Sequence, residues 1–174
     1  MKFNAAQKKA VSMFDDPEFI ANIKEEDTTM VKHLDILKKI NENGYLTKNS
    51  QAGRKSNEYE RAYIQGFMMK TRAIEFLKRM NIETDKNAIC ITINEKEPMF
   101  NIPLTIQKNQ KWEVVTHMST TVPLRIWNQE RKYLNLDANI VYIFCWDPKW
   151  NRNASNKNGL FTDVLKILNK MKSI

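Results

Sequence analysis

Glycine, cysteine and histidine are scarce in this chain of 174 residues, which contains only four, two and two of them. Neither a GxxxxGK(S/T) pattern nor a GxGxxG after a strand occurs, which excludes the ordinary nucleotide-binding signatures. No CxxC, HxxxH or HExxH spacing occurs either, so the sequence predicts no zinc site. We therefore expect neither a bound metal nor a cofactor.

Long apolar runs are missing as well. No run approaches the ~20 residues that a helix needs to cross a bilayer, and no apolar segment follows the lysines of residues 1–10, as a secretory signal requires. Cys90 and Cys145 lie in apolar, strand-like runs, where a free cysteine behaves as a small hydrophobic residue. The sequence thus predicts a cytoplasmic protein without a membrane partner or a structural disulfide.

The composition is typical of one globular domain. Hydrophobic residues make up 42% of the chain and charged residues 28%, which excludes a disordered protein. A chain of this length can bury a core without disulfides or metals. No repeat, low-complexity tract or linker interrupts it, so we expect a single domain over residues 1–174.

The net charge of +8 is unevenly distributed. Residues 30–80 contain eleven Lys and Arg against five Asp and Glu, and residues 144–174 contain six against two. Such an excess suits an anionic partner, either nucleic acid or phosphate. A lysine-rich surface that only keeps the protein soluble explains it equally well.

Helical spacing of apolar residues predicts helices over residues 3–14, 71–80 and 160–171 and a short helix within residues 121–134. Residues 15–17 break the first helix, and a polar stretch follows over residues 24–27. A further helix begins at Thr28 or Thr29, either of which can cap it. It ends at Gly44, where a positive φ is tolerated.

Alternating and β-branched runs predict strands over residues 45–47, 59–68 and 88–94, a hairpin over residues 102–107 and 112–118, and a strand over residues 139–146. For residues 59–68 the alternative is a helix. The last run is almost continuously apolar, which is typical of a central strand covered on both faces. Polar loops are expected over residues 48–57 and 147–159. The predicted fold is α+β, a mixed sheet of about five strands with helices packed on at least one face.

The few glycines coincide with the two basic blocks. Gly44, Gly53 and Gly66 fall in the first block, and Gly159 falls in the second. In a chain with so little glycine, each one usually marks a positive φ or a close backbone approach. This coincidence is the main reason to expect a site there.

Several residues of the first block form a recognisable pattern, namely Asn41, Gly44, Tyr45, Thr47, Ser50, Gln51 and Gly53, followed by Glu60, Arg61, Ala62, Gly66 and Phe67. The pattern resembles an uncharacterised family of small proteins from large DNA viruses and actinobacteria. In that family a helix leads into N-x-x-G-(Y/F)-(L/V)-T-x-x-S-Q-P-G and then (E/Q)-R-A-x-(V/I)-x-G-F. Ala52 replaces the usual proline, so a less rigid loop is expected.

A shorter pattern of the same family, D-x-x-W-x-R-N, matches Asp147, Trp150, Arg152 and Asn153. The resemblance covers residues 30–68 and 147–165. It implies a shared fold and a shared site, and it supplies no reaction.

The first candidate surface is the predicted loop that holds Ser50, Gln51 and Gly53. Its side-chain donors and backbone N–H groups suit a phosphate or a base edge, although they can equally satisfy the loop's own backbone. Arg61 can hold a phosphate with two hydrogen bonds. Its alternative partner is one of the glutamates just before it, Glu58 or Glu60.

The second candidate surface follows the predicted central strand, where ligands bind in open sheets. Trp150 can stack on a nucleotide while Lys149 and Arg152 neutralise its charge. Alternatively, Trp146 belongs to the core, Trp150 covers it, and residues 147–148 form a turn.

The leading hypothesis is therefore a binding module for nucleic acid or a phosphorylated nucleotide. Its expected ligand-binding residues are Ser50, Gln51, Gly53, Arg54, Arg61, Tyr63, Asp147, Lys149, Trp150 and Arg152. A second hypothesis is a small enzyme for a nucleotide-like substrate, with one pocket formed by Ser50, Gln51, Glu60, Tyr63 and Asp147. A third is a protein–protein adaptor of viral origin that uses Trp112, Trp127 and Trp150 as anchors.

No catalytic residue is assigned. A Ser–His–Asp arrangement would combine Ser50 or Ser119 with His33 or His117, and no G-x-S-x-G turn supports it.

Overall fold

The computed structural model describes residues 2–53, 61–83, 89–93, 99–108, 111–121, 139–150 and 153–171. Its helices are α1 (Lys2–Met13), α2 (Pro17–Glu26), the 3₁₀ turn η1 (Val31–His33), α3 (Leu34–Glu42), α4 (Lys70–Glu83) and α6 (Leu160–Lys170). Its strands are β1 (Leu46–Gln51), β2 (Arg61–Met69), β3 (Ile89–Ile93), β4 (Met99–Lys108), β5 (Lys111–Thr121) and β6 (Ile140–Trp150).

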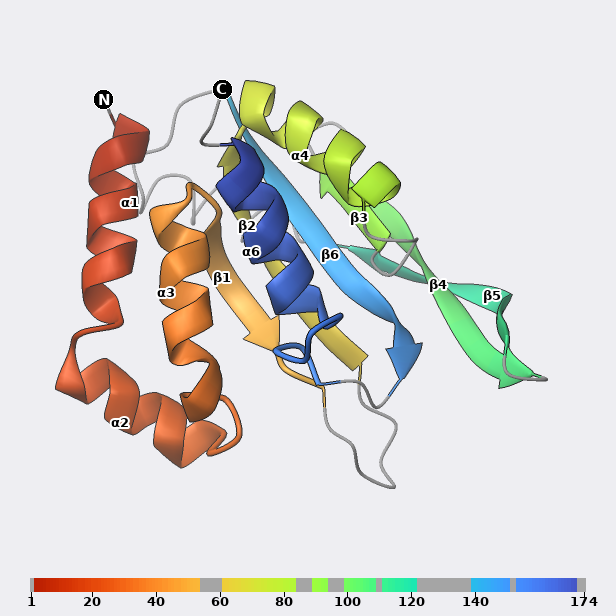
Figure 1. Cartoon of the computed structure of the whole chain (residues 1–174), viewed down its shortest axis with the longest axis horizontal. Helices are drawn as coiled ribbons and strands as arrows, with labels where there is room; N and C mark the ends of the chain where they lie inside the picture. The colour runs from red at the N-terminus through yellow and green to blue at the C-terminus, as the bar shows by residue number, and fades with distance from the viewer. Residues whose placement is uncertain are drawn as a thin grey trace.

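Four of these strands form one sheet in the order β1-β2-β6-β3, and β4 and β5 form a separate hairpin (Figure 1). The predicted α+β class is confirmed. The single mixed sheet of about five strands is not confirmed, because every pairing between the described strands is antiparallel. The reason is the position of β6, which lies between β2 and β3 and runs against both. The helix α4 connects β2 to β3, but these two parallel strands never become neighbours.

One face of the four-stranded sheet carries the main core. Ile64 and Met68 of β2 and Ile143 and Cys145 of β6 are completely buried there, against residues of α3, α4 and α6. These three helices lie in front of the sheet in Figure 1. The amphipathic α6 is buried along one side, which confirms the prediction of a terminal helix.

The opposite face has a smaller core at its α1 end. Phe3 and Ala6 of α1 pack against Leu46, Phe67 and Tyr142. The rings of Phe67 and Tyr142 meet edge to face with their centres 5.0 Å apart. The strand β6 is therefore central and has packed side chains on both faces, as its apolar run predicts.

The corner between α3 and β1 is fixed by hydrogen bonds from one buried side chain. The amide of Asn41 donates to the Leu37 carbonyl (2.9 Å) and to the Thr47 hydroxyl (2.7 Å), and its oxygen accepts from the Thr47 N–H (3.0 Å). Gly44 makes the turn with a φ of +82°, a conformation that side chains with a Cβ disfavour. Three residues of the sequence pattern thus build the corner rather than a site.

Two other pattern residues fix β1 on its neighbour. Tyr45 is fully buried, and its hydroxyl donates toward the carbonyls of Ile64 (3.2 Å) and Ile143 (3.0 Å). Gly66 lies under a bulge in β1, where a Cβ would stand only 2.0 Å from the Leu46 carbonyl oxygen. A glycine at this position lets the two backbones approach closely.

The helix α2 was not expected. Residues 15–17 predict a break, yet Asp16 caps the new helix by accepting from the Glu18 N–H at 2.9 Å, and Pro17 occupies the first position. Both residues therefore start a helix rather than only ending one. Thr28 and Thr29 do not cap α3, because η1 precedes it and Asp27 instead accepts from the Thr29 N–H.

Two predicted loops are partly strand. The strand β1 continues through Gln51, and β6 continues through Trp150. Each extension pairs with β2. The short helix expected within residues 121–134 falls almost entirely outside the described residues.

Candidate functional site

The predicted Ser50–Gln51 loop is wrong in its secondary structure. Both residues belong to β1 and are half-buried, with Ser50 opposite Ile64 and Gln51 opposite Tyr63. Gly53 follows with a φ of +67° and is buried. A polar strand is tolerated here because β1 is an edge strand of the four-stranded sheet.

The structure brings parts of the two glycine-bearing basic blocks together. The carbonyl of Ala52 accepts a 2.7 Å hydrogen bond from the N–H of Ala154. The end of β1 therefore lies beside the loop that leads into α6. The sequence-predicted Gln51, Tyr63 and Asp147 all lie on strands near this junction.

Other members of the predicted site lie outside the described residues. This holds for Arg54 and Arg152, and for Glu58 and Glu60, the expected alternative partners of Arg61. Lys149 and Trp150 belong to β6, but their side chains lie outside the described part, as do those of Trp112 and Trp127. Their assignments stay predictions.

Arg61 and Asp147 interact through their charges. Asp147 is fully buried and Arg61 is half-buried at the start of β2. Burial lowers the pKa of the Arg61 guanidinium, and the charge of Asp147 raises it. A carboxylate on the neighbouring strand thus balances part of the positive charge that a phosphate would otherwise meet.

Ser50 and Asp147 are separated by the whole width of β2. Two strand spacings of 4.7–4.9 Å put their backbones about 10 Å apart or more. A hydrogen bond reaches only about 3 Å. The described residues therefore do not gather these two members of the expected enzyme pocket around one reacting group.

Two aromatic rings on the central strands form what we call the aromatic platform, Tyr63 and Phe144. Their rings stack with centres 5.7 Å apart and planes 18° from parallel. Both side chains are half-buried, and Phe144 also meets the buried Trp146 edge to face at 5.3 Å. The platform lies on the face opposite the main core, where Phe144 also packs against the smaller core that includes Phe3 and Ala6 of α1.

Carboxamide groups surround the aromatic platform. Asn49 lies opposite Gln65, and Gln51 lies opposite Tyr63. The Tyr63 hydroxyl donates to the Asn49 oxygen (3.3 Å), and the Tyr142 hydroxyl donates to the Gln65 oxygen (2.7 Å). These bonds engage the carbonyl ends of both amides and direct their NH₂ groups toward other acceptors.

The ionisation of Tyr63 suits this role. Burial raises the pKa of its phenol above the ordinary 10.0, and the hydrogen bond with Asn49 lowers it by less. The hydroxyl therefore stays protonated at neutral pH and remains a donor. Sequence reasoning identified Gln51 and Tyr63 but missed Asn49, Gln65 and Phe144.

One hydrogen-bonded pair, between buried His33 and exposed Ser155, has no counterpart in the sequence analysis. His33 is only 1% exposed, and its Nδ1 lies 2.5 Å from the hydroxyl of Ser155, 122 residues further along the chain. Its ring meets Phe161 edge to face at 5.9 Å. The pair connects η1 to the loop before α6. No spacing in the sequence could have indicated it, since only the fold makes these residues neighbours.

We expect acid to destabilise the protein through His33. Burial, followed by the charge of Lys32, lowers the pKa of its imidazole, while Asp27 raises it by less. Below about pH 6.5 the unfolded chain therefore binds a proton that the folded chain does not. The free energy of unfolding therefore decreases as the pH drops below that value, until the pH passes the pKa of His33 in the folded protein.

The free energy of unfolding measured from pH 7.5 to 5.0 checks this expectation. His33→Gln should flatten the decline, because the titrating group is gone. Ser155→Ala keeps the imidazole and should keep a pH-dependent decline. Equal slopes for the original protein and His33→Gln would contradict the assignment.

Among the described residues, no three His, Cys, Asp or Glu side chains are grouped so that they could hold a metal ion. None of the helices in the described part combines the length and apolar character that crossing a bilayer requires.

Comparison with known proteins agrees with an uncharacterised family. No curated protein matches the sequence. A family model described as a domain of unknown function, DUF6919, matches residues 13–171, which leaves most of α1 outside. The viral or actinobacterial origin that the resemblance implied stays a prediction. Because the match spans nearly the whole sequence, the chain belongs to the DUF6919 family.

Proposed function

We propose that the protein is a binding module for single-stranded nucleic acid or a nucleotide, which stacks a base on the aromatic platform. The single observation that carries the proposal is the stacked, half-buried pair of Tyr63 and Phe144 on the two central strands. Stacking on an aromatic side chain contributes about 1–3 kcal/mol per base.

The polar surroundings support the same ligand. Asn49 and Gln65 have their carbonyl ends engaged by tyrosine hydroxyls, and so they offer NH₂ donors to base oxygen and nitrogen acceptors. Lys48 is exposed beside Asn49. The net charge of +8 lowers the electrostatic free energy of a polyanion nearby.

Single strands fit the platform better than a duplex. Bases are available for stacking only where they are not already stacked within a helix. Four-stranded sheets that bind single-stranded RNA use aromatic side chains in this way. The comparison concerns the arrangement only, since a fold by itself does not determine a function.

The basic residues named from the sequence have a place in this proposal. Arg61 begins β2 two residues before Tyr63, and it can contact a phosphate of a strand whose base stacks on the platform. We propose that Arg54, Lys149 and Arg152 add to the same phosphate track. We also propose a cytoplasmic location for the single domain, in a host cell if its origin is viral.

Fluorescence anisotropy with labelled single-stranded RNA, single-stranded DNA and duplex DNA tests the proposal. We expect single strands to bind more tightly than the duplex, with affinity that falls steeply as salt rises. Tyr63→Leu and Phe144→Leu should each weaken binding by roughly tenfold, because leucine keeps apolar volume but cannot stack.

The control is Ile74→Ala, which alters a side chain on α4 that is 63% exposed and belongs to the opposite side of the sheet. It should leave affinity unchanged, and circular dichroism should show all variants folded. Absence of any single-strand binding at low salt would overturn the proposal. So would leucine variants that bind as tightly as the original protein.

A further inference from the structure

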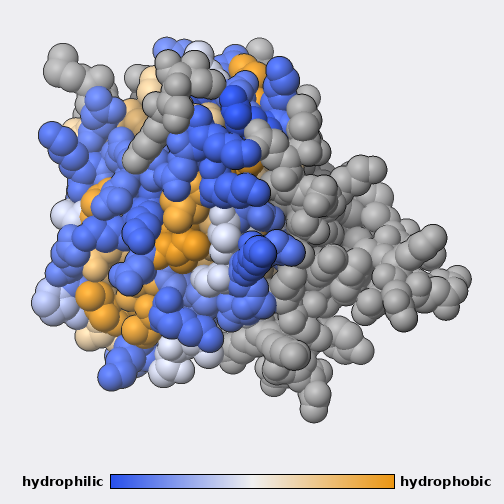
Figure 2. Space-filling model, in the orientation of Figure 1, coloured by the Kyte–Doolittle hydropathy of each residue, from blue (hydrophilic) through white to orange (hydrophobic). Residues whose placement is uncertain are grey.

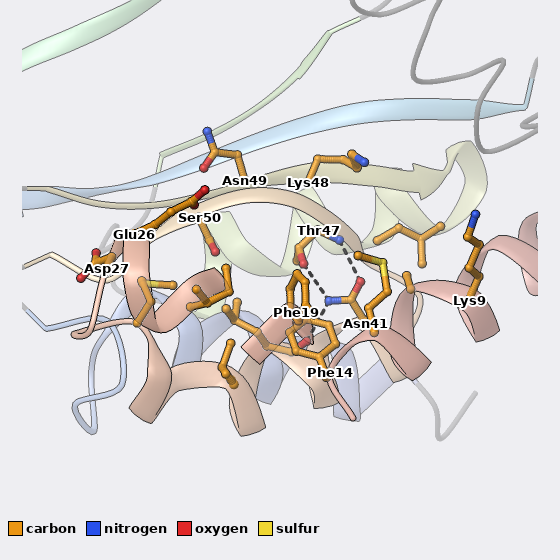
Figure 3. Close-up of a pocket in the computed structure, with 17 residues that line it drawn as sticks. Lys9, Phe14, Phe19, Glu26, Asp27, Asn41, Thr47, Lys48, Asn49 and Ser50 are labelled. Atoms are coloured by element: carbon orange, nitrogen blue, oxygen red, sulfur yellow. Dashed lines mark hydrogen bonds between the residues drawn. The ribbon is translucent and has the colours of Figure 1, made fainter. Parts of the chain in front are cut away.

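A pocket of about 420 Å³ lies between β1 and the helices α1, α2 and α3 (Figure 3). Its walls are largely apolar and include Met13, Phe14, Phe19 and Leu37. The strand residues Thr47 to Ser50 form its polar side. The volume lies within the range of about 300–1,000 Å³ that is typical of small-molecule sites.

The helix α2 leaves this pocket unfilled. None of its residues is fully buried, and Phe19 and Ile23 are half-buried. Figure 2 shows apolar surface over α2 at the lower left of an otherwise mostly hydrophilic face. Met13, which also lines the pocket, is 43% exposed. Apolar side chains therefore surround a space that no described side chain occupies.

The two ends of the pocket differ in charge. Lys9 lies at the α1 end, and Glu26 and Asp27 lie at the opposite end (Figure 3). Asp27 already accepts hydrogen bonds from the N–H and the hydroxyl of Thr29, at 2.9 and 2.6 Å. Local donors therefore offset much of its charge. Lysines line the pocket from two elements, Lys9 from α1 and Lys48 from β1.

We propose that this pocket binds a small, elongated amphipathic anion, of the class of a medium-chain carboxylic acid. The acyl chain lies against Phe14, Phe19 and Leu37, where burial of apolar surface drives binding. The carboxylate is held near the ammonium group of Lys9. The site lies at the edge of the sheet and shares Lys48 and Asn49 with the surroundings of the aromatic platform, but its apolar walls and its ligand go beyond the proposed function.

An added peptide strand is the less suitable occupant. A peptide that extends a sheet needs the free N–H and C=O groups of the edge strand. The Thr47 N–H of β1, at the first residue of the pocket's polar side, is already bonded to the Asn41 side chain. Asn41 thus occupies part of the edge that an added strand would use.

Isothermal titration calorimetry of the full chain with decanoic acid tests the proposal. Decylamine and decanol, with the same chain and a cationic or neutral head, are the comparison probes. We expect one saturable site for decanoic acid and at least about tenfold weaker binding of decylamine. Ala10→Trp places a large ring at a half-buried position of the lining and should weaken decanoic acid by a similar factor.

A second pair of variants keeps the test independent of folding. Lys9→Gln changes an exposed side chain, and it should weaken decanoic acid several-fold while leaving decanol unchanged. The matched control is Lys8→Gln, an exposed neighbour that does not line the pocket. The proposal is overturned if no probe saturates, if decylamine binds best, or if folded Ala10→Trp binds decanoic acid unchanged.

Discussion

Gly66→Ala is expected to destabilise the protein strongly, and more than Gly44→Ala. The new Cβ would stand 2.0 Å from the Leu46 oxygen, 2.7 Å from its carbonyl carbon and 2.8 Å from the Thr47 Cα. All three are backbone atoms, which cannot rotate away. The strands must separate locally, so we expect a loss of roughly 3 kcal/mol or more in the free energy of unfolding.

Chemical denaturation measures this loss, and Gly44→Ala is the matched control. Gly44 has a positive φ, and its nearest neighbour is the side chain of Arg72 at 3.4 Å. The same substitution there adds only backbone strain, about 1–2 kcal/mol. If Gly66→Ala proved no more destabilising than Gly44→Ala, the close approach of β1 and β2 would be wrong.

Asn41→Ala should produce the second large loss. The substitution removes three hydrogen bonds and leaves the Leu37 carbonyl and the Thr47 N–H without this partner. At about 0.5–1.5 kcal/mol for each bond, with a further penalty for unsatisfied buried groups, we expect a loss of roughly 3 kcal/mol. The amide of Thr47 should also exchange its hydrogen faster, because it loses its acceptor.

Asn43→Ala provides the comparison, two residues along and with the same chemical change. Asn43 is also buried, but its amide makes one observed bond, to the Lys39 carbonyl at 2.7 Å. We expect about 1 kcal/mol for it. Equal losses for the two variants, with unchanged exchange at Thr47, would rule out Asn41 as the fixing point of the corner.

Helices and strands could be predicted from the sequence where their buried apolar residues recur at a regular spacing. The helices α4 and α6 have apolar residues at helical spacing. The strands β2, β3 and β6 have alternating or continuous apolar runs. The helix α2 was missed because its apolar residues Phe19, Ile20 and Ile23 are few and only half-buried. Its start signal, Asp16 followed by Pro17, is the same pair that suggests a break.

The candidate site was predictable only in part, because it depends on strand order. Gln51 and Tyr63 were selected as polar residues near glycines, and β1–β2 pairing makes them neighbours. Phe144 was assigned to a strand covered on both faces, which hid its half-exposed ring. Tyr63 and Phe144 are far apart in the sequence, so only the position of β6 beside β2 reveals their stacking.

The bulge in β1 decides which polar side chains meet a ligand. The pairing moves from Thr47 opposite Gly66 to Asn49 opposite Gln65, so Lys48 is the extra residue. A regular ladder would instead place Lys48 opposite Gln65, and every later residue of β1 would change sides. The bulge accommodates this extra residue and therefore keeps Asn49 and Gln51 on the face of the sheet that carries the aromatic platform. Deleting Lys48 would remove the bulge but keep Asn49 opposite Gln65 and Gln51 opposite Tyr63, so both faces would keep their side chains.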